Sequence, residues 1–427
     1  MDDHTNARQL NRRTFLKTAG AVAGTAALGL PTLLRAQAPT VKIGVITPVT
    51  GPLAEVGQLQ RLGAQMAVEA INAAGGIKSM GGAKLDLILA DTETKHDVAR
   101  TEMERVINAG AQLVMGGFHS GSVSAMAPVA QQRRVPYIID ISAADAPTHS
   151  VAQAVREGKQ KVQYVYRIFP SSSIFGKLAV KYMTEIFRET KTSPKRVVVT
   201  YTNDAFGKPQ AASFVEAAKA ANPGWEIVEV IPYPEDAKDL STEVSRMKAL
   251  KPDVISPVTR PATAILLLQE LAKQRVDLMG IISPGAPGLY EPRQREILRE
   301  NIEYVMDSTI WHNVKSPRAQ KIEEEHIKRT GGKNLGAEAG YGYEAILVMA
   351  DVLERSKSAD PDAIVDAIKK TNFTGGIMMS TGPIRFNEFG DNPNAATAMI
   401  QILKNKPIVV WPKDAAQAQV VFPRPKV

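Results

Sequence analysis

The stretch from Val41 to Ala90 constrains the fold of this chain more than any other part of the sequence. Residues 41–46, VKIGVI, form a short apolar run typical of a buried strand, which ends at Thr47-Pro48. Apolar side chains then recur at helical spacing, at Leu59, Leu62, Met66 and Ala70. A second apolar run, LDLILA, follows at residues 85–90. Strand, helix and strand in this order predict a βαβ unit of a parallel sheet.

The loop between the first strand and the helix, residues 47–56, is the first candidate for part of a binding site. Ligands of open parallel sheets bind at the carboxyl ends of the strands, which places this loop at the rim of such a site. The loop lacks the G-x-G-x-x-G pattern, so it gives no reason to expect a bound dinucleotide.

The alternation of strands and helices continues along the chain. Further strands are expected at residues 113–115, 137–141, 197–201, 226–231 and 254–258, and further helices at 97–108, 174–189, 240–250, 262–274, 316–329, 340–355 and 361–370. Shorter apolar patterns around Met126 and Phe214 predict two more helices, and a hairpin is expected over 399–410. These patterns predict an α/β fold in which each of two lobes is a doubly wound parallel sheet flanked by helices.

Three extended segments, near residues 168, 308 and 378, are expected to connect the two lobes. Lobe one would comprise residues 39–168 and 309–378, and lobe two residues 169–308 and 379–427. Three connecting segments form a hinge that suits closure around a ligand.

Charge and cysteine content argue against several classes of function. The chain has 52 basic and 44 acidic residues, and removing residues 1–38 leaves 47 and 42. This mild, unclustered excess argues against nucleic acid as a partner, which requires a concentrated basic face. The chain has no cysteine, which excludes disulfides, thiolate metal sites, cysteine nucleophiles and a lipoprotein anchor.

The N-terminus predicts export. Residues 11–17, NRRTFLK, closely resemble the twin-arginine motif, and residues 36–38, AQA, fit a signal cleavage site. Residues 18–34 are rich in glycine and alanine and contain Pro31, so a cleaved signal is favoured over a membrane anchor. We therefore expect the twin-arginine export machinery to deliver a soluble mature protein to the periplasm, after removal of residues 1–38.

Several motifs in a fixed order carry a resemblance to a known family. They are IGV at 43–45, TGPLA at 50–54, AINAAGGI at 70–77, MGG at 115–117, VPY at 135–137, NDAFG at 203–207 and VVWP at 409–412. Together they are similar to the periplasmic solute-binding proteins of the Leu/Ile/Val-binding type, which serve ABC importers. The likeness covers residues 41–413. It implies two lobes that close on a small solute and an inner-membrane ABC permease as partner, with no catalytic residue, cofactor or metal. We also expect a monomer.

The resemblance assigns the carboxylate of an amino-acid solute to lobe one. In the family, a serine after the third strand and backbone and hydroxyl groups after the fourth strand hold that carboxylate. The matching positions here are Ser120, Gly121, Ser142, Ala143 and Ala144. Ser120 also lies where a helix is expected to begin, and free N–H groups at such a point attract anions. The alternative is that Ser120 or Ser122 is only a helix cap.

Lobe two both matches and departs from the family pattern. Phe206 matches an aromatic residue that covers the ligand, although an ordinary packing role is equally plausible. The acidic residue that usually binds an α-ammonium is replaced by Gly285, and Arg260 stands where an aromatic residue is common. Arg260 would favour an anionic or carbonyl group on the ligand, unless it caps a helix or pairs with a neighbour. An aromatic or short aliphatic acid therefore fits at least as well as Leu, Ile or Val.

Two other functions remain open. An exported hydrolase is suggested by His119-Ser120, but residues 117–121 read G-x-x-S-G rather than G-x-S-x-G, and the six histidines form no H-E-x-x-H motif. A sensor of amides or similar small solutes would share the same fold.

Overall fold

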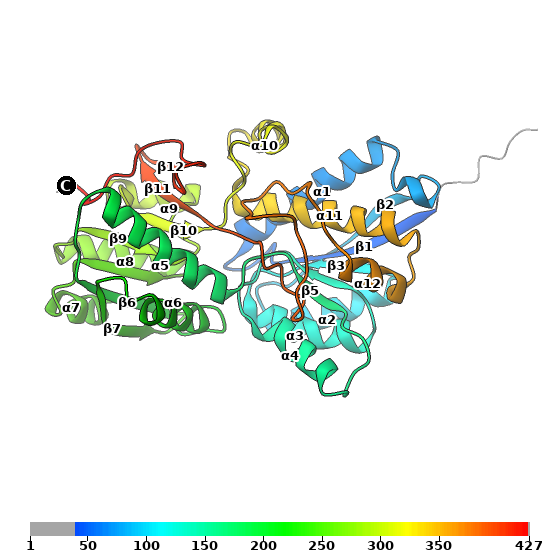
Figure 1. Ribbon diagram of the computed structural model, residues 1–427, viewed down its shortest axis with the longest axis horizontal. Helices are drawn as coiled ribbons and strands as arrows, with labels where there is room; N and C mark the ends of the chain where they lie inside the picture. Colours follow the sequence, from blue (N-terminus) through cyan, green and yellow to red (C-terminus); the bar gives the residue numbers. More distant parts are fainter. Residues whose placement is uncertain (1–38, 426–427) are drawn as a thin grey trace, which may run out of the picture. The chain divides into compact units, whose positions relative to one another are not determined.

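The computed structural model describes residues 39–425, so the predicted export signal lies outside the described residues. Two sheets organise this part of the chain. The sheet of lobe one has the strand order β2-β1-β3-β4-β5, and the sheet of lobe two has the order β12-β11-β10-β9-β8-β6-β7. Figure 1 shows the two lobes, with the blue and cyan strands β1, β2 and β3 in lobe one, and the green strands β6 to β9 and the orange-red β11 and β12 in lobe two.

The five strands of lobe one all pair in parallel. They are β1 (Thr40–Thr47), β2 (Lys84–Asp91), β3 (Leu113–Gly116), β4 (Tyr137–Ile139) and β5 (Val165–Arg167). In the central pairing, Ile43 of β1 lies opposite Leu113 of β3, and Val114 lies opposite Tyr137 of β4. These central residues are fully buried, because helices cover both faces of a parallel sheet.

Lobe two combines a parallel sheet with an antiparallel hairpin. Its strands are β6 (Arg196–Thr202), β7 (Glu226–Tyr233), β8 (Val254–Val258), β9 (Gly280–Ser283), β10 (Met306–Thr309), β11 (Ala398–Leu403) and β12 (Lys406–Trp411). Strands β6 to β10 pair in parallel, whereas β11 and β12 add an antiparallel edge beyond β10. The predicted hairpin is therefore confirmed as part of this sheet.

The helices of lobe one come from both ends of the chain. They are α1 (Ala54–Ala73), α2 (His96–Asn108), α3 (Ser120–Gln132), α4 (Ala146–Arg156), α10 (Pro317–Thr330), α11 (Gly336–Ser356) and α12 (Pro361–Lys369). Two glycines let α1 and α11 approach closely: a Cβ on Gly63 would lie 2.0 Å from Ala339 O, and one on Gly342 would lie 2.1 Å from Gln60 O. The gold α11 consequently lies along the blue α1 in Figure 1.

Lobe two takes its helices from the middle of the chain. They are α5 (Ser172–Glu189), α6 (Gly207–Ala221), α7 (Ser241–Ala249), α8 (Pro261–Lys273) and α9 (Pro292–Leu298). Short 3₁₀ turns occur at Lys78–Met80 and Arg299–Ile302. The sequence did not predict α4, α9 or β9, and it predicted β4 two residues too long. None of the described helices combines the length and apolarity needed to cross a bilayer.

The chain crosses between the lobes after β5, after β10 and before β11. The segment after Met378 remains bonded to lobe one, because Asn392 N donates to Arg167 O (2.9 Å) and Asp391 bridges to Arg167. Tyr182 Oη of α5 then donates to Thr397 O (2.9 Å). We propose that the third crossing lies near 396–398, later than the position near 378 expected from the sequence.

Candidate functional site

A small pocket between the lobes brings the carboxyl ends of both sheets together. Lobe one contributes Phe118, Ile141, Ser142, Ala143 and Glu338; lobe two contributes Phe206, Arg260, Gly285, Ala286, Pro287 and Tyr290; the crossing segments and the first turn of α5 contribute Phe169, Phe175, Thr309 and Ile310. The pocket has a volume of about 40 Å³. That volume accommodates roughly three water molecules. We refer to this cavity as the interlobe pocket.

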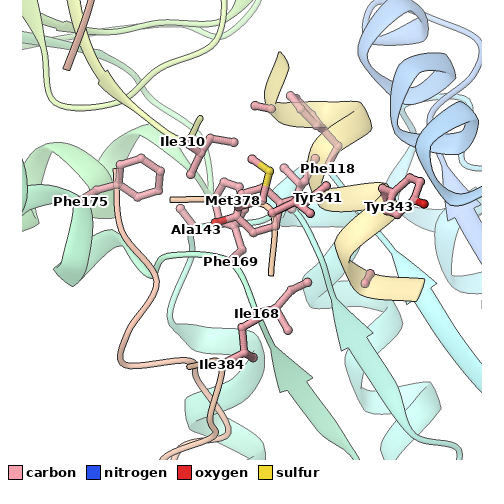
Figure 2. Close-up of a cluster of buried hydrophobic side chains, with 14 of the residues drawn as sticks. Phe118, Ala143, Ile168, Phe169, Phe175, Ile310, Tyr341, Tyr343, Met378 and Ile384 are labelled. Carbon is pink, nitrogen blue, oxygen red and sulfur yellow. The ribbon is translucent and has the colours of Figure 1, made fainter. Parts of the chain in front are cut away.

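Aromatic side chains form much of the pocket wall. Phe169, at the first crossing, packs against Phe175 of α5 with ring centres 5.7 Å apart and against Tyr341 of α11 with ring centres 5.0 Å apart. Figure 2 shows these rings together with Phe118, Ala143 and Ile310 in one buried cluster. The wall is therefore continuous with the hydrophobic core and is apolar over most of its area.

A buried arginine orients the loop that follows β4. Arg167 is fully buried, and its Nη1 donates to the carbonyl oxygens of Ser142 (3.3 Å), Ala143 (3.0 Å) and Ala144. Ser172 N also donates to Ala143 O (2.8 Å). Within residues 39–425, the N–H groups of residues 142–144 donate to no protein acceptor, although all three residues are buried. Buried N–H groups rarely lack an acceptor, so this loop is suited to hold a ligand oxygen.

Arg167 is itself held by an acidic partner. Its Nε and Nη2 lie 3.0 and 2.8 Å from Asp391 Oδ1, and Asp391 also accepts from Thr148 Oγ1 (2.8 Å). Burial disfavours the charged form of Asp391, but the Arg167 charge and these hydrogen bonds outweigh it and lower the pKa of Asp391. The pair therefore remains charged inside lobe one.

The start of α3 lies behind this loop. Ser120 Oγ is 3.1 Å from Ser142 Oγ, so Ser120 reaches the pocket through Ser142 and does not line it directly. The helix cap is His119, and neither Ser120 nor Ser122 supplies a side-chain cap. Gly121 packs on His96, because a Cβ at Gly121 would lie 2.4 Å from the imidazole ring.

Arg260 and Phe206 form the charged side of the pocket in lobe two. The Arg260 guanidinium carbon lies 4.7 Å from the centre of the Phe206 ring. Arg260 Nε donates to Asp204 Oδ2 (2.8 Å), and Asp204 Oδ1 accepts from the backbone N–H groups of Phe206 and Gly207 at the start of α6. Arg260 is thus a buried residue that both lines the pocket and pairs with a neighbour, rather than a surface arginine.

Gly285 has a backbone conformation that excludes a side chain. Its φ is +109°, and a Cβ at this position would lie 2.5 Å from the Phe175 ring. No acidic side chain can therefore occupy this position without moving Phe175. Gly285 nevertheless lines the pocket, as the sequence suggested.

Apart from the bonds of Ser172 and Ser173 at the start of α5, two sets of polar contacts near the interlobe pocket cross between the lobes. His119 Nε2 of lobe one lies 2.9 Å from Glu235 Oε1 of lobe two, and His119 Nδ1 lies 2.7 Å from His96 Nε2. The hydrogen bond from His119 lowers the pKa of Glu235, while burial lowers the pKa of His96. The second contact is the hydrogen bond from Tyr290 Oη of lobe two to Glu338 Oε1 of lobe one (3.1 Å).

Sequence reasoning missed Glu338, Tyr290 and Arg167. Glu338 precedes the predicted start of its helix. Tyr290 lies between β9 and α9, which the sequence did not predict. Arg167 lies in an extended segment whose apolar neighbours suggested only a crossing. A single arginine in a fully buried strand is a usable signal, because arginine is rarely buried without a partner.

Two groups of potential metal ligands occur among the described residues. His119, Asp204 and Glu235 form one, and Asp145, His149 and Asp391 form the other. An arginine occupies each group, since Arg260 lies 2.7 Å from Asp204 and Arg167 lies 2.8 Å from Asp391. Both groups therefore already have a cation of their own, and the residues fit a guanidinium better than a metal ion.

Comparisons with known proteins agree with this architecture. The profile of a family described as periplasmic binding protein matches residues 40–406, and that of the twin-arginine translocation pathway signal sequence matches residues 9–29. The Leu/Ile/Val-binding protein homolog 8 of Brucella abortus is 24% identical over 399 residues, which cover 92% of this chain and 95% of that protein.

Solved structures share the fold. One is the substrate-binding protein of a branched-chain amino acid transporter from Streptococcus pneumoniae, solved in complex with isoleucine. It is 21% identical to this chain, with a TM-score of 0.73, and the match covers 90% of this chain and 100% of that protein. A solute-binding protein from R. palustris, in complex with benzoate, is 16% identical with a TM-score of 0.71, over 90% of this chain and 97% of its own. The predicted two-lobe fold is confirmed by these likenesses.

Proposed function

This chain belongs to the periplasmic binding protein family, and we propose that it captures a small carboxylate-bearing solute and delivers it to an ABC permease of the inner membrane. The twin-arginine signal directs the protein to the periplasm, where such a receptor operates. Lobe closure is the working step, since the pocket is built from both lobes and from the segments that connect them.

The loop at residues 142–144 is the observation that carries this proposal. Arg167 binds the loop carbonyls, and the N–H groups of these buried residues have no acceptor among the described residues. A carboxylate can accept several such bonds at once, and charge-assisted bonds are the stronger kind. The adjacent hydroxyl groups of Ser120 and Ser142 can add to this anion site.

The rest of the pocket supports a solute with an apolar body. Phe118, Phe169, Phe175 and Phe206 present ring surfaces to the cavity, and few polar groups accompany them. Relatives of this fold have been solved with isoleucine and with benzoate, which share a carboxylate attached to an apolar body. An aliphatic or aromatic acid therefore suits the chemistry of the pocket wall.

Solute entry requires the lobes to separate. The cavity volume of about 40 Å³ is far below the roughly 300 Å³ at which small-molecule pockets begin. The three crossings permit this separation, and the contacts of His119 with Glu235 and of Tyr290 with Glu338 would re-form on closure.

We propose a monomeric receptor without catalytic activity. The exported-hydrolase alternative needs His119 as a base for Ser120, but both ring nitrogens of His119 face other partners, His96 and Glu235. A sensor of amides remains the second candidate, because the same loop N–H groups would also bind an amide carbonyl.

A thermal-shift panel on mature protein, unfolded and refolded to strip bound solute, tests the proposal. The panel contains leucine, isoleucine, valine, phenylalanine, benzoate, short dicarboxylates and the amides of these acids. A carboxylate at 100 to 1,000 times its Kd should stabilise the protein by about 3–4 kcal/mol, whereas its amide should not. If the amides stabilise the protein as well as the acids do, the sensor function replaces transport.

Arg260→Ala refines the result, with Arg275→Ala on an exposed turn of lobe two as the control. The Arg260 variant should alter the ranking of solutes, because it removes the cation next to Phe206. If the ranking of solutes by stabilisation is unchanged, Arg260 does not contact the solute.

A further inference from the structure

One carboxylate lines the interlobe pocket without a cationic partner. Glu338, in the first turn of α11, is 3% exposed and lines the pocket from lobe one. Its hydrogen-bond partner is the neutral hydroxyl of Tyr290, at 3.1 Å from Oε1. Within residues 39–425, no lysine, arginine or histidine nitrogen lies within ion-pair distance of Glu338.

A second carboxylate lies close to the first. Glu291 is 5% exposed and accepts from Gly288 N at 2.9 and 2.8 Å, which fixes the turn that presents Tyr290. Burial, followed by the negative charge of Glu338, raises the pKa of Glu291 to about 8, and burial also raises the pKa of Glu338. Both pKa shifts have the same cause, which is the unfavourable free energy of placing a negative charge in an apolar wall.

The other charges at the pocket do not offset this cost. Arg260 is paired with Asp204, and Arg167 is paired with Asp391. The pocket wall and the residues directly behind it therefore hold two neutral pairs and an acidic group. A simple carboxylate anion would meet this acidic group uncompensated, whereas a solute with both charges would satisfy the loop N–H groups and the acid together.

We propose that Glu338 binds a positively charged ammonium group of the solute, so that this receptor selects zwitterionic amino acids over acids of the same shape. The inference rests on the proposed function above. Glu338 would provide, from lobe one, the acidic group that is absent at the position of Gly285 in lobe two. Because Tyr290 joins Glu338 from the opposite lobe, an ammonium bound at Glu338 would be held next to a contact that forms only when the lobes close.

The test uses pairs of solutes that differ only in the ammonium group. Leucine is compared with 4-methylpentanoate, and phenylalanine with 3-phenylpropanoate, by titration calorimetry on refolded mature protein. The wild-type protein should bind the amino acid of a pair at least tenfold more tightly. Glu338→Gln keeps the shape of the side chain, and it should weaken the amino acid at least tenfold while changing the desamino acid less than threefold.

Two further variants make the test specific. Glu324→Gln removes one exposed negative charge from α10 in lobe one and should leave both affinities unchanged. Tyr290→Phe removes only the hydroxyl next to Glu338, so it should keep the preference for the amino acid while weakening both solutes similarly. If Glu338→Gln does not fold, the preference of the wild-type protein within each pair of solutes still tests the inference.

The outcomes separate this inference from the function on which it rests. Equal or tighter binding of the desamino acids by the wild type, or equal losses of both solutes in Glu338→Gln, would overturn the role of Glu338 and leave the transport function intact. If none of these solutes and no carboxylate of the panel binds, the proposed function fails together with the inference.

Discussion

Single buried charges shape this site more than its hydroxyl groups do. Arg167 is fully buried and does not line the pocket itself; it acts by holding three carbonyl oxygens of the loop at residues 142–144. Its charge is balanced by Asp391, which comes from a segment 224 residues away in sequence. One ion pair therefore joins the first crossing, the binding loop and the C-terminal part of lobe one.

Arg167→Met is expected to destabilise the protein by about 3–5 kcal/mol, because it removes the cation that compensates the buried charge of Asp391 and leaves only the bonds from Thr148 and His149. Urea unfolding measures the loss. The control is Arg134→Met, which breaks an exposed ion pair with Asp362 and should cost less than about 1 kcal/mol. If both variants lose the same small amount, Arg167 does not carry the structural role assigned to it.

Sequence reasoning found the carboxylate loop but not what orients it. Ser142, Ala143, Phe206, Arg260 and Gly285 were selected by position, and all of them line the pocket. Their assignment as solute contacts stays a prediction. Glu338 and Tyr290 were missed because they come together only when the two lobes pack against each other. The two residues lie far from the predicted site residues of the other lobe in sequence, and no local sequence pattern indicates such a contact.

At the scale of elements, the packing of α1 against α11 holds lobe one together. The two helices approach through Gly63 and Gly342, whose missing side chains allow backbone contact with the opposite helix. Glu338 lies on the first turn of α11, so this packing also sets its position in the pocket.

Gly63→Ala should therefore destabilise lobe one even though alanine is the better helix former. Its Cβ would lie 2.0 Å from Ala339 O, which forces the helices apart at a cost of about 1–3 kcal/mol. Thermal unfolding provides the measurement, and Ala70→Ser, which adds one atom to an exposed position of α1, is the control. A gain in stability for Gly63→Ala would show that the close approach does not exist in solution.

The elements that were predicted differ from those that were missed in length and pattern. Helix α1 has 20 residues with regular apolar spacing, and it was found. Strand β9 has only four residues, and α9 has seven, five of them polar or charged or proline. Strand β4 stops at Ile139 because Asp140 turns to accept a hydrogen bond from Gln60 Nε2 (2.7 Å). Side-chain contacts of this kind leave no periodic signal.

At the scale of the whole molecule, closure brings together a polar contact outside the interlobe pocket. His119 and Glu235 lie on different lobes, and Arg260 lies 4.0 Å from Glu235. This contact stabilises the closed form without touching the interlobe pocket.

Glu235→Gln should weaken every solute by about twofold to tenfold and leave the ranking of solutes unchanged, because it removes a charge-assisted contact of the closed form only. Calorimetric titration with two unrelated solutes gives the comparison, and Asp236→Asn on the adjacent exposed residue is the control. A selective loss for one solute would mean that Glu235 contacts the ligand.

The same contact gives a pH dependence with a definite sign. The hydrogen bond from His119, assisted by the positive charge of Arg260, lowers the pKa of Glu235 below its ordinary value of 4.5, and Asp204 and His96 are the other ionisable groups facing this contact. The contribution of Glu235 is complete above pH 4.5 and is lost as the pH falls through the lowered value. The Glu235→Gln variant should therefore show a smaller loss of affinity than the wild type between pH 5 and the onset of acid unfolding.

The order of the strands has a consequence for how the protein is made. Neither lobe is encoded by one continuous stretch, because α11 and α12 complete lobe one and β11 and β12 complete the sheet of lobe two. A growing chain that stops before residue 336 exposes the inner face of α1, and one that stops before residue 398 leaves β10 as an open edge. Both lobes are therefore finished only when synthesis is nearly over, and premature termination would yield no half-receptor able to hold a solute.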